Sequence, residues 1–394
     1  MFNKPIAFVS PWYGEGISGG AEAELRGVVK HLQAAGVPLE VLSTCVKSFT
    51  DNWNVNYHKQ GTTTEGGILV RRFKVRRRNT RAFDAVNYKL MQGQRLSPRE
   101  EKVYCKEMIN SPRLYDYMAK YKDRYALFVF IPYMFGTTYY GCQVEPSKSV
   151  LIPCFHDEPY AYMDCFHEAF SQVKGMVFNA EPERELAERL FNTKGQTNIT
   201  MGIGVDTDWS CDAQRFKQKF GIEAPFVLYA GRKDEGKNVH TLIQYYEEYK
   251  RRHGDDLKLV LIGGGEVHNP DPQNIIDMGF VEVQDKYDAY AAASFLCNPS
   301  MNESFSLVIM ESWLAQRPVL VHGKCPVTRD FAVRSNGGLY FQNYGEFEGC
   351  VTYLLEHESI AMQMGQNGHA FVNQNFAWDS IVKKYIDYFE SVVA

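Results

Sequence analysis

The sequence predicts an α/β protein built from two doubly wound domains. Three observations support this prediction: short apolar segments alternate with amphipathic ones along the whole chain, the alternation starts afresh near residue 226, and 394 residues are enough for two domains. Short, continuously apolar strands are typical of parallel sheets that helices cover on both faces. We therefore expect two parallel sheets, each with its own helices.

In the first half, apolar runs predict strands and helical spacing predicts helices. Leu25, Val28, Val29 and Leu32 recur three and four residues apart, which predicts a helix that Gly36 ends. The expected elements in order are strand 5–10, helix 21–35, strand 38–43, strand 67–75, helix 113–123, strand 126–131, strand 149–153, helix 160–172, strand 175–178 and helix 181–191.

The second half repeats the pattern from the strand FVLYA at 226–230. Leu242, Ile243, Tyr246 and Tyr249 lie on one face of the next helix. The expected elements are strand 226–230, helix 239–252, strand 257–262, helix 285–293, strand 295–297, helix 304–315, strand 318–322 and an apolar-faced helix at 379–393.

The seam between the domains is expected within GIGVDTDWS, residues 202–210. This places one domain at 1–205 and the other at 206–376, and we expect the closing helix, 377–394, to pack back on the first domain. Doubly wound domains bind ligands beyond the carboxyl ends of their strands. With two such domains facing each other, the expected site is the deep cleft between them.

Composition narrows the function classes. A net charge of -4 argues against a nucleic-acid partner, since such proteins usually carry a basic excess. No apolar run approaches the roughly 20 residues of a membrane span, and the N-terminal apolar run is too short for a signal peptide. The nine cysteines are scattered without metal spacing, which predicts free thiols in a reducing compartment. We expect a cytoplasmic protein.

The loop FVSPWYGEGISGGAEAEL contains a literal G-x-G-x-x-G at Gly14, Gly16 and Gly19. A dinucleotide fingerprint needs an acid at the end of the second strand, and Glu40 stands at the beginning of strand 38–43 instead. We interpret Gly19 and Gly20 as the opening of helix 21–35, where N–H groups are accessible to an anion. A turn that merely needs positive φ remains the alternative.

Two loops of the second half carry the sharper pattern. Arg232 and Lys237 follow strand 226–230, and two cations at that edge suit a diphosphate. Glu303 precedes helix 304–315, so the N–H groups of Ser304, Phe305 and Ser306 are expected to open that helix. Glu311 lies eight residues further on, roughly 12 Å along a helix, and needs a partner because its helix is apolar nearly all round. A solvated loop and a dipole-matching acid remain the structural alternatives.

These motifs resemble those of glycosyltransferase family 4, the group 1 glycosyltransferases, which are retaining enzymes of the GT-B fold. The matching segments are Gly19-Gly20-Ala21-Glu22, Gly204-Val205-Asp206-Thr207, Gly231-Arg232 with Lys237 and Leu242-Ile243, Glu303-Ser304-Phe305-Ser306-Leu307 with Glu311, and Arg317-Pro318-Val319. The resemblance spans nearly the whole chain and is strongest over 226–322. It implies two Rossmann-like domains. Ser306 departs from the family's usual glycine, and its Cβ is expected to narrow the choice of donor sugar.

The resemblance also implies roles for single residues. Arg232 and Lys237 would hold the donor diphosphate, with Gly19 and Gly20 at the same phosphates. Glu303 and the amides of Ser304, Phe305 and Ser306 would bind the transferred sugar. The remaining assignments are Glu311 to the ribose, backbone at Phe280-Val281 to the base, and His156 to a position beside the reacting carbon; a packed loop histidine is the structural alternative for His156. Asp157, next to it just past strand 149–153, is expected to bind substrate in the cleft.

The expected reaction is retaining transfer of a hexose-type sugar from a nucleotide-diphosphate sugar, UDP-sugar first and GDP-mannose next, to a glycan, lipid-linked or small-molecule acceptor. Fixed cations and amides stabilise the leaving diphosphate, so no metal or other cofactor is expected. Asp206-Thr207-Asp208 reads as a D-x-D, which is a weak metal signal in a seam. An epimerase or phosphorylase on the same fold, a non-catalytic nucleotide-sugar binding protein and an oxidoreductase remain alternatives.

The acceptor side carries two segments of note. RRFKVRRRNTR, residues 71–81, has seven cations in eleven positions, which indicates either a solvated basic strand or a patch for an anionic acceptor or a membrane surface. PYMFGTTYYG, residues 132–141, either stacks on an acceptor sugar or fills the cleft wall.

Overall fold

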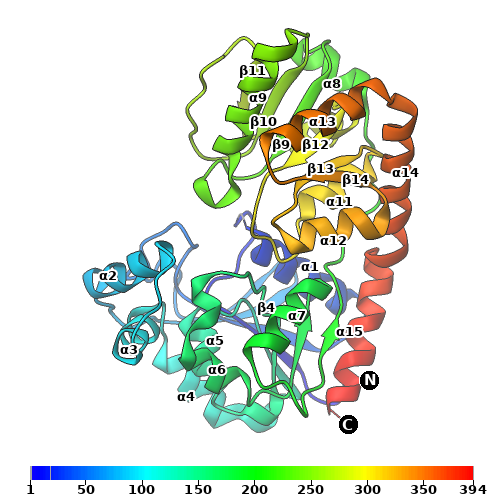
Figure 1. The fold of residues 1–394 in the computed structure, drawn as a ribbon. Helices are drawn as coiled ribbons and strands as arrows, with labels where there is room; N and C mark the ends of the chain where they lie inside the picture. Colours follow the sequence, from blue (N-terminus) through cyan, green and yellow to red (C-terminus); the bar gives the residue numbers. More distant parts are fainter. Residues whose placement is uncertain (1, 18, 394) are drawn as a thin grey trace. The chain divides into compact units, whose positions relative to one another are not determined.

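The computed structural model describes residues 2–17 and 19–393 and divides them into two compact units. Unit 1 comprises Met1–Gly204 together with Trp378–Ala394, and unit 2 comprises Val205–Ala377. The sequence placed these boundaries at 205/206 and 376/377, within one residue of the observed ones. Each unit holds one sheet covered by helices, as the sequence predicts for a doubly wound α/β fold (Figure 1).

Unit 1 contains an eight-stranded sheet in the order β3-β4-β2-β1-β5-β6-β7-β8. Every neighbouring pair is parallel except β3 and β4, which are antiparallel. The strands are β1 (Ile6–Ser10), β2 (Leu39–Thr44), β3 (Gly61–Glu65), β4 (Ile68–Phe73), β5 (Leu127–Phe130), β6 (Ser149–Leu151), β7 (Gly175–Phe178) and β8 (Ile199–Thr200).

The helices of unit 1 include three that the sequence analysis did not predict, α2, α3 and α5. The α-helices are α1 (Gly20–Ala34), α2 (Thr80–Met91), α3 (Pro98–Glu107), α4 (Pro112–Tyr121), α5 (Gly136–Gly141), α6 (Asp164–Phe170), α7 (Glu181–Leu190) and α15 (Trp378–Val393). Three 3₁₀ turns, η1 (Lys122–Arg124), η2 (Pro146–Lys148) and η3 (Pro159–Tyr162), join them. The single helix expected at 160–172 was wrong: Pro159 opens η3, Met163 is extended, and α6 begins only at Asp164.

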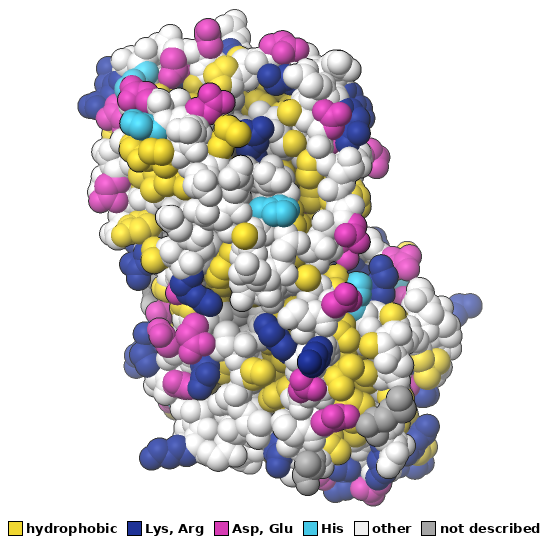
Figure 2. Space-filling view, turned by 90° about the vertical axis from the view of Figure 1, so that its right-hand side faces the viewer, with side chains coloured by type: hydrophobic (Ala, Val, Ile, Leu, Met, Phe, Trp, Pro, Cys, Tyr) yellow, Lys and Arg dark blue, Asp and Glu magenta, His cyan; other side chains and the backbone are white. Residues whose placement is uncertain are grey.

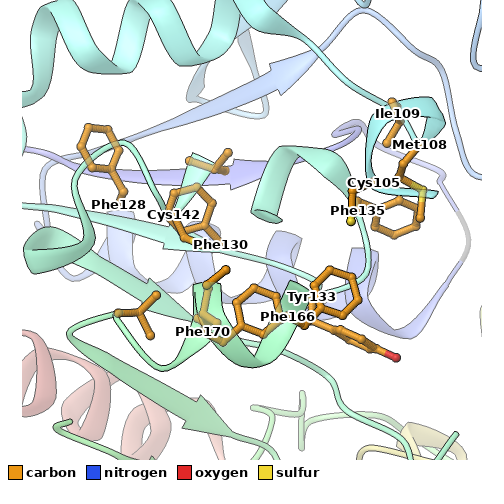
Figure 3. Close-up of a cluster of buried hydrophobic side chains, with 14 of the residues drawn as sticks. Cys105, Met108, Ile109, Phe128, Phe130, Tyr133, Phe135, Cys142, Phe166 and Phe170 are labelled. Carbon is orange, nitrogen blue, oxygen red and sulfur yellow. The ribbon is translucent and has the colours of Figure 1, made fainter. Parts of the chain in front are cut away.

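The core of unit 1 includes the aromatic loop 132–141. Tyr133 and Phe135 are 1% and 3% exposed, and they pack with Phe166, Cys105 and neighbouring side chains in the buried cluster of Figure 3. The Tyr133 and Phe166 ring centroids lie 5.6 Å apart. These two loop aromatics therefore fill the interior of unit 1 and are not available to stack on a sugar.

Helix α15 completes unit 1 although it lies far from the rest of that unit in sequence. Its Trp378 stacks on His31 of α1, with ring centroids 4.2 Å apart. A Cβ at Gly27 would lie 2.4 Å from Trp378, and a Cβ at Gly204 would lie 2.2 Å from it. Both positions therefore need glycine because the indole occupies the space of a side chain.

Unit 2 holds a six-stranded sheet in the order β11-β10-β9-β12-β13-β14, and all its neighbouring pairs are parallel. The strands are β9 (Phe226–Ala230), β10 (Lys258–Ile262), β11 (Ile275–Gly279), β12 (Phe295–Asn298), β13 (Val319–His322) and β14 (Gly338–Phe341). The carboxyl ends of these strands form one edge of the sheet, which is where such folds place their ligands.

The helices of unit 2 cover both faces of this sheet. They are α8 (Ala213–Phe220), α9 (Val239–His253), α10 (Val283–Ala292), α11 (Leu307–Leu314), α12 (Pro326–Ser335), α13 (Tyr344–Glu356) and α14 (Glu358–Asn375), with the 3₁₀ turn η4 (Glu235–Lys237) before α9. Apolar residues of α9 and α13 share one buried cluster with β9 and β10. The sequence analysis did not predict α8, β11 or the elements from α12 to α14.

The surface shows mixed charge. On the face drawn in Figure 2, Lys and Arg side chains lie among Asp and Glu side chains, in keeping with a net charge of -4. Among the helices of the described residues, none is long and apolar enough to cross a membrane.

Candidate active site

Lys237 and Glu303 form an ion pair at the carboxyl edge of the unit 2 sheet. Lys237 Nζ lies 2.7 Å from Glu303 Oε1, and the two side chains are 28% and 12% exposed. Their loops follow β9 and β12, which are adjacent parallel strands. Two residues that the sequence assigned to one ligand, the diphosphate cation and the sugar-binding acid, are therefore in direct contact.

Asn238 fixes the geometry of this pair. It adopts a left-handed conformation with φ of 55° between η4 and α9. Its Nδ2 donates to the Pro299 carbonyl at 3.0 Å, and its Oδ1 accepts from Thr241 Oγ1 at 2.6 Å. Because Asn238 is buried and ties the β9 loop to the β12 loop, Lys237 and Glu303 are held together by backbone as well as by charge.

Arg232 is more open than Lys237. Its side chain is 58% exposed, and its Nε lies 3.4 Å from Asp234 Oδ2. Gly231 before it has φ of 149°, and its N–H donates to the Ile262 carbonyl at 2.9 Å. An exposed ion pair of this kind contributes little stability, so the guanidinium can exchange the Asp234 carboxylate for a phosphate at small cost.

Lys233 is a site-loop residue that sequence reasoning missed. The alternative of a solvated loop does not hold for this residue, because its side chain is 2% exposed and pairs with Asp277 of β11. Its N–H donates to the Gly264 carbonyl at 2.7 Å. Lys233 therefore fastens the Arg232 loop to the neighbouring strands.

The structure corrects the expected start of helix 304–315. Helix α11 begins at Leu307, so Ser304, Phe305 and Ser306 belong to the preceding loop and Glu303 is not helical. Phe305 is 1% exposed and packs against Phe331 and Phe376, with ring centroids 5.2 and 4.9 Å away. Of Phe305, only the backbone remains available to a ligand.

Ser306 explains why the helix starts late. It adopts φ of 83° and ψ of 80°, a left-handed conformation that residues with a Cβ rarely take. Its Oγ accepts a hydrogen bond from Asn298 Nδ2 at 2.8 Å, and both residues are buried. This bond offsets part of the backbone strain at a position where the sequence resemblance leads us to expect glycine.

Glu311 has the partners that its apolar helix requires. Oε1 accepts from Lys286 Nζ at 2.6 Å, and Oε2 accepts from Tyr290 Oη at 2.8 Å. The carboxylate is 16% exposed, and both partners come from α10. A ribose that binds Glu311 would therefore share it with Lys286 and Tyr290, which sequence reasoning did not identify.

Val281 lines a cavity of about 710 Å³ that follows β11. Ile276, Met278 and Phe280 supply further apolar walls, and Phe280 is 81% exposed. The segment expected to read a base thus borders a hollow with apolar walls and the charged residues Lys219, Glu282 and Asp285 in its lining, and the hollow is large enough for a small ligand.

In unit 1, Gly19 and Gly20 form the start of α1. Gly19 is the N-cap with φ of 139°, and a Cβ there would lie 1.9 Å from Glu22 Oε2. The Glu22 carboxylate in turn accepts from Trp12 Nε1 at 2.7 Å. Ser18, within the same loop, lies outside the described residues. The glycine at position 19 is required by its backbone angle, since the Glu22 carboxylate is the end of a flexible side chain and could move away from a Cβ.

His156 and Asp157 lie in the loop after β6. His156 Nδ1 is 3.4 Å from Glu158 Oε1, and the imidazole is 31% exposed. Asp157 accepts from Tyr162 Oη at 2.6 Å and lies 3.3 Å from Arg189 Nη2. The two residues are neighbours at the carboxyl edge of the unit 1 sheet, and each has its own partners.

A buried acid pair supports this loop. Glu183 accepts from the N–H groups of Phe155 and Asn179, both at 2.6 Å. Glu24 accepts from Asn179 Nδ2 at 2.9 Å. Burial raises the pKa of Glu24 to about 8, which leaves its carboxyl neutral at pH 7. Burial also raises the pKa of Glu183 to about 8, although the N–H groups of Asn179 and Phe155 favour its charged form.

Within residues 2–17 and 19–393, no group of three or more His, Cys, Asp or Glu side chains is placed to hold a metal ion. Asp206 of the D-x-D is exposed at the start of unit 2. The cysteines of the described chain are all free, and Cys105 Sγ lies 3.3 Å from Cys165 Sγ.

Comparisons with known proteins agree on the fold. Residues 211–371 match the model of glycosyl transferases group 1. D-inositol 3-phosphate glycosyltransferase of Corynebacterium aurimucosum is 26% identical over 230 residues, which are 52% of this chain and 53% of that protein. The chain spans about half the length of the curated relatives it matches.

Two solved structures match over nearly the whole chain. Sucrose-phosphate synthase of Thermosynechococcus elongatus has a TM-score of 0.71 at 16% identity and covers 99% of both chains. HepE of Anabaena, solved in complex with UDP-glucose, has a TM-score of 0.68 at 15% identity over 99% of this chain and 100% of that one. At these identities the likeness shows the fold.

Proposed function

We propose that this chain, which carries a group 1 glycosyltransferase domain at residues 211–371 on a GT-B fold, is a retaining hexosyltransferase. Its donor is a nucleotide-diphosphate sugar, a UDP-sugar first and GDP-mannose next. Its acceptor is a glycan, a lipid-linked sugar or a small molecule. HepE, solved with UDP-glucose, favours uridine as the first base to test.

The observation that carries this proposal is the ion pair of Lys237 with Glu303. Both groups lie at the carboxyl edge of adjacent strands, with the exposed guanidinium of Arg232 in the same loop as Lys237. A cation beside a carboxylate suits a ligand that brings negative phosphates and neutral hydroxyls together, because each protein group then meets its complement. A sugar nucleotide has this combination.

The chemistry follows from charge. As the bond between the sugar's anomeric carbon and the diphosphate oxygen breaks, negative charge grows on the leaving diphosphate. Lys237 and Arg232 stabilise that charge, and Glu303 holds the sugar hydroxyls. The acceptor oxygen bonds to the same face of the carbon, and its proton passes to the departing phosphate. No protein nucleophile and no metal are part of this proposal.

The remaining residues position the two substrates. We assign Gly19 and Gly20 to the donor phosphates, Glu311 to the ribose, Val281 to the base, and the backbone of Ser304, Phe305 and Ser306 to the sugar. His156 is assigned to a position beside the reacting carbon, and Asp157 to substrate binding next to it. The cytoplasmic location, and the membrane contact through 71–81, stay predictions of the sequence.

The test is a thermal-shift screen of nucleoside diphosphates and their sugars. A ligand that binds the folded state raises its melting temperature, so the correct base shows the largest shift. Glu303→Ala should keep the shift with the bare diphosphate and lose sugar transfer. The anomeric configuration of the product, read by NMR, tests retention, and unchanged turnover in EDTA tests metal independence. Wild-type transfer by Glu303→Ala would contradict the site.

A further inference from the structure

The basic segment 71–81 separates into arginines that are already paired and arginines that are not. Three are held by carboxylates of unit 1, namely Arg71 by Glu40, Arg72 by Glu65 and Arg76 by Glu107. The segment is therefore not a uniformly solvated basic face, because three of its charges are used within the fold.

Arg77 and Arg78 lie beside a cavity of about 570 Å³ between β4 and α2. Asn79, Thr80 and Lys106 also line it. Arg77 is exposed, and among the described residues its side chain makes no ion pair. The volume lies within the range of small-ligand sites. The cavity thus has cationic walls and one carboxylate, Glu107, which already binds Arg76.

Arg78 is the unusual group in this cavity. Its side chain is only 7% exposed, and its Nε has no hydrogen-bond partner in the described part of the chain. The guanidinium carbon lies 4.7 Å from the Trp53 ring centroid and 4.3 Å from that of Phe83. The nearest carboxylate, Asp84, is 3.9 Å away and exposed. Aromatic faces and the exposed Asp84 carboxylate offset part of the lost hydration, but a buried guanidinium with one long ion pair and an unpaired Nε remains costly.

Backbone donors accompany Arg78. Thr80 begins α2, and within the described residues the N–H groups of Thr80 and Arg81 donate to no acceptor of the fold. Asn54 holds this turn in place, because its Oδ1 accepts from Arg78 N at 2.7 Å and its Nδ2 donates to Thr80 Oγ1 at 3.2 Å. A planar guanidinium and a free helix start, fixed in advance, are the donors that bind phosphate oxygens best.

We propose that this cavity binds a phosphate or diphosphate group of the acceptor, held by Arg78, Arg77 and the first N–H groups of α2. The acceptor role rests on the proposed function, whereas the anion site stands on the cavity alone. Because three arginines of the segment are already paired, and Arg77 and Arg78 lie around this one open hollow, the arrangement favours a single anionic group over an extended membrane surface.

The position of the cavity limits the shape of the acceptor. It follows β4, and His156 follows β6 at the same edge of the same sheet. Four steps between strands separate β4 from β6, which is roughly 19 Å. An acceptor that reacts beside His156 and places its phosphate here is longer than a single sugar phosphate. We infer an extended acceptor with its anionic group distant from the reacting hydroxyl.

The test uses calorimetric titration of inorganic pyrophosphate into the full chain. The background is the Arg232→Ala/Lys237→Ala variant, which removes the proposed donor phosphate site. We expect binding to persist in that background and to weaken about tenfold or more with Arg78→Met. Because Arg78 packs against two rings, the exposed Arg77→Gln serves as the variant that keeps the fold. Arg95→Gln, an exposed arginine outside the cavity, is the matched control and should change nothing.

Two results would overturn the site: no pyrophosphate binding in the Arg232→Ala/Lys237→Ala background, or binding that neither Arg77→Gln nor Arg78→Met weakens. If the wild-type chain binds no nucleoside diphosphate but keeps Arg77-dependent pyrophosphate binding, the proposed function fails and the anion site stands. A third result would replace the site with a membrane surface. In that case the chain binds no pyrophosphate, but it cosediments with phosphatidylcholine vesicles that contain phosphatidylglycerol, and Arg77→Gln abolishes the cosedimentation.

Competition identifies the source of the phosphate. Farnesyl diphosphate and glucose 6-phosphate are each titrated against bound pyrophosphate in the same background, with glucose as the neutral control. Displacement by farnesyl diphosphate alone assigns a lipid-linked acceptor, and displacement by glucose 6-phosphate assigns a longer water-soluble acceptor whose phosphorylated end this probe represents. If neither displaces pyrophosphate, the acceptor role is wrong.

Discussion

Lys237 Nζ lies 2.7 Å from Glu303 Oε1, and this contact joins the loops that follow two adjacent strands of unit 2. Without a ligand, each group neutralises the other. In the proposed function, Lys237 binds the phosphates of a sugar nucleotide and Glu303 accepts from its hydroxyls. Both charged groups are then in position before the ligand binds, and until then each compensates the charge of the other.

Replacing one partner of this pair should lower the free energy of unfolding more than replacing both partners. Lys237→Met leaves a carboxylate that is 12% exposed without its cation, and we expect a loss of about 1–3 kcal/mol in the free energy of unfolding. The double variant Lys237→Met/Glu303→Gln should recover part of that loss and remain inactive. Urea unfolding measures both. Lys217→Met on α8 is the control, and additive losses in the double variant would contradict the coupling.

At Ser306 the strained backbone should make a glycine variant more stable than an alanine variant, which is the reverse of the usual order of stability. With φ of 83°, glycine relieves strain of about 1 kcal/mol, whereas alanine keeps it and also loses the bond from Asn298. We expect Ser306→Ala to unfold at lower urea than Ser306→Gly. The glycine variant should also accept a wider set of donor sugars. Equal donor preference in wild type and Ser306→Gly would remove the proposed steric role.

Glu24 should make the stability of unit 1 depend on pH. Its folded pKa of about 8 lies above its ordinary value of 4.5, so the folded state holds a proton that the unfolded state has lost. Its contribution is complete below the ordinary value and disappears as pH rises through about 8. Glu24→Gln cannot ionise. The stability of the variant relative to wild type should therefore increase from about pH 5 to pH 9, as measured by the urea midpoint of unfolding at each pH. Parallel plots of midpoint against pH for the two proteins would refute the assignment.

Glu183 positions the His156 loop through a bond to the neighbouring N–H. Glutamine offers one acceptor oxygen where Phe155 and Asn179 donate to two, so Glu183→Gln leaves one buried N–H unpaired, at about 1–3 kcal/mol. We expect slower transfer with unchanged binding of the nucleoside diphosphate. Glu188→Gln, on the exposed side of α7, is the control. A variant that loses diphosphate binding instead would indicate global damage.

The sequence predicted the alternating sheets well because their strands are short and apolar, as FVLYA at β9 shows. It missed α5 and α2, although α2 places Phe83, Val86 and Leu90 on one buried face at helical spacing, and it missed α3, whose polar composition hides the helical period. A signal was present, since Ser97 and Glu100 form a capping box around Pro98. The late start of α11 was not readable, because it depends on the left-handed Ser306 and its contact with Asn298 across the loop.

Pairings between distant segments were equally hidden. The sequence indicated that Glu311 needs a partner but could not name Lys286, because two helices meet only once the sheet is formed. In the same way, a run of arginines in the sequence shows that a segment is positively charged but does not show which partner each guanidinium contacts. Whether a guanidinium meets a carboxylate, as Arg72 does with Glu65, or an aromatic face, as Arg78 does with Trp53, depends on tertiary packing.

The return of Trp378 to α1 sets an order of events during translation. Unit 2 is one unbroken stretch of chain, whereas unit 1 needs residues 378–393 to fill the space beside Gly27 and Gly204. Until the ribosome has added those residues, the apolar surface of unit 1 that α15 covers stays exposed. Unit 2 can fold during that time, so unit 1, whose synthesis begins first, is the unit that completes its folding last.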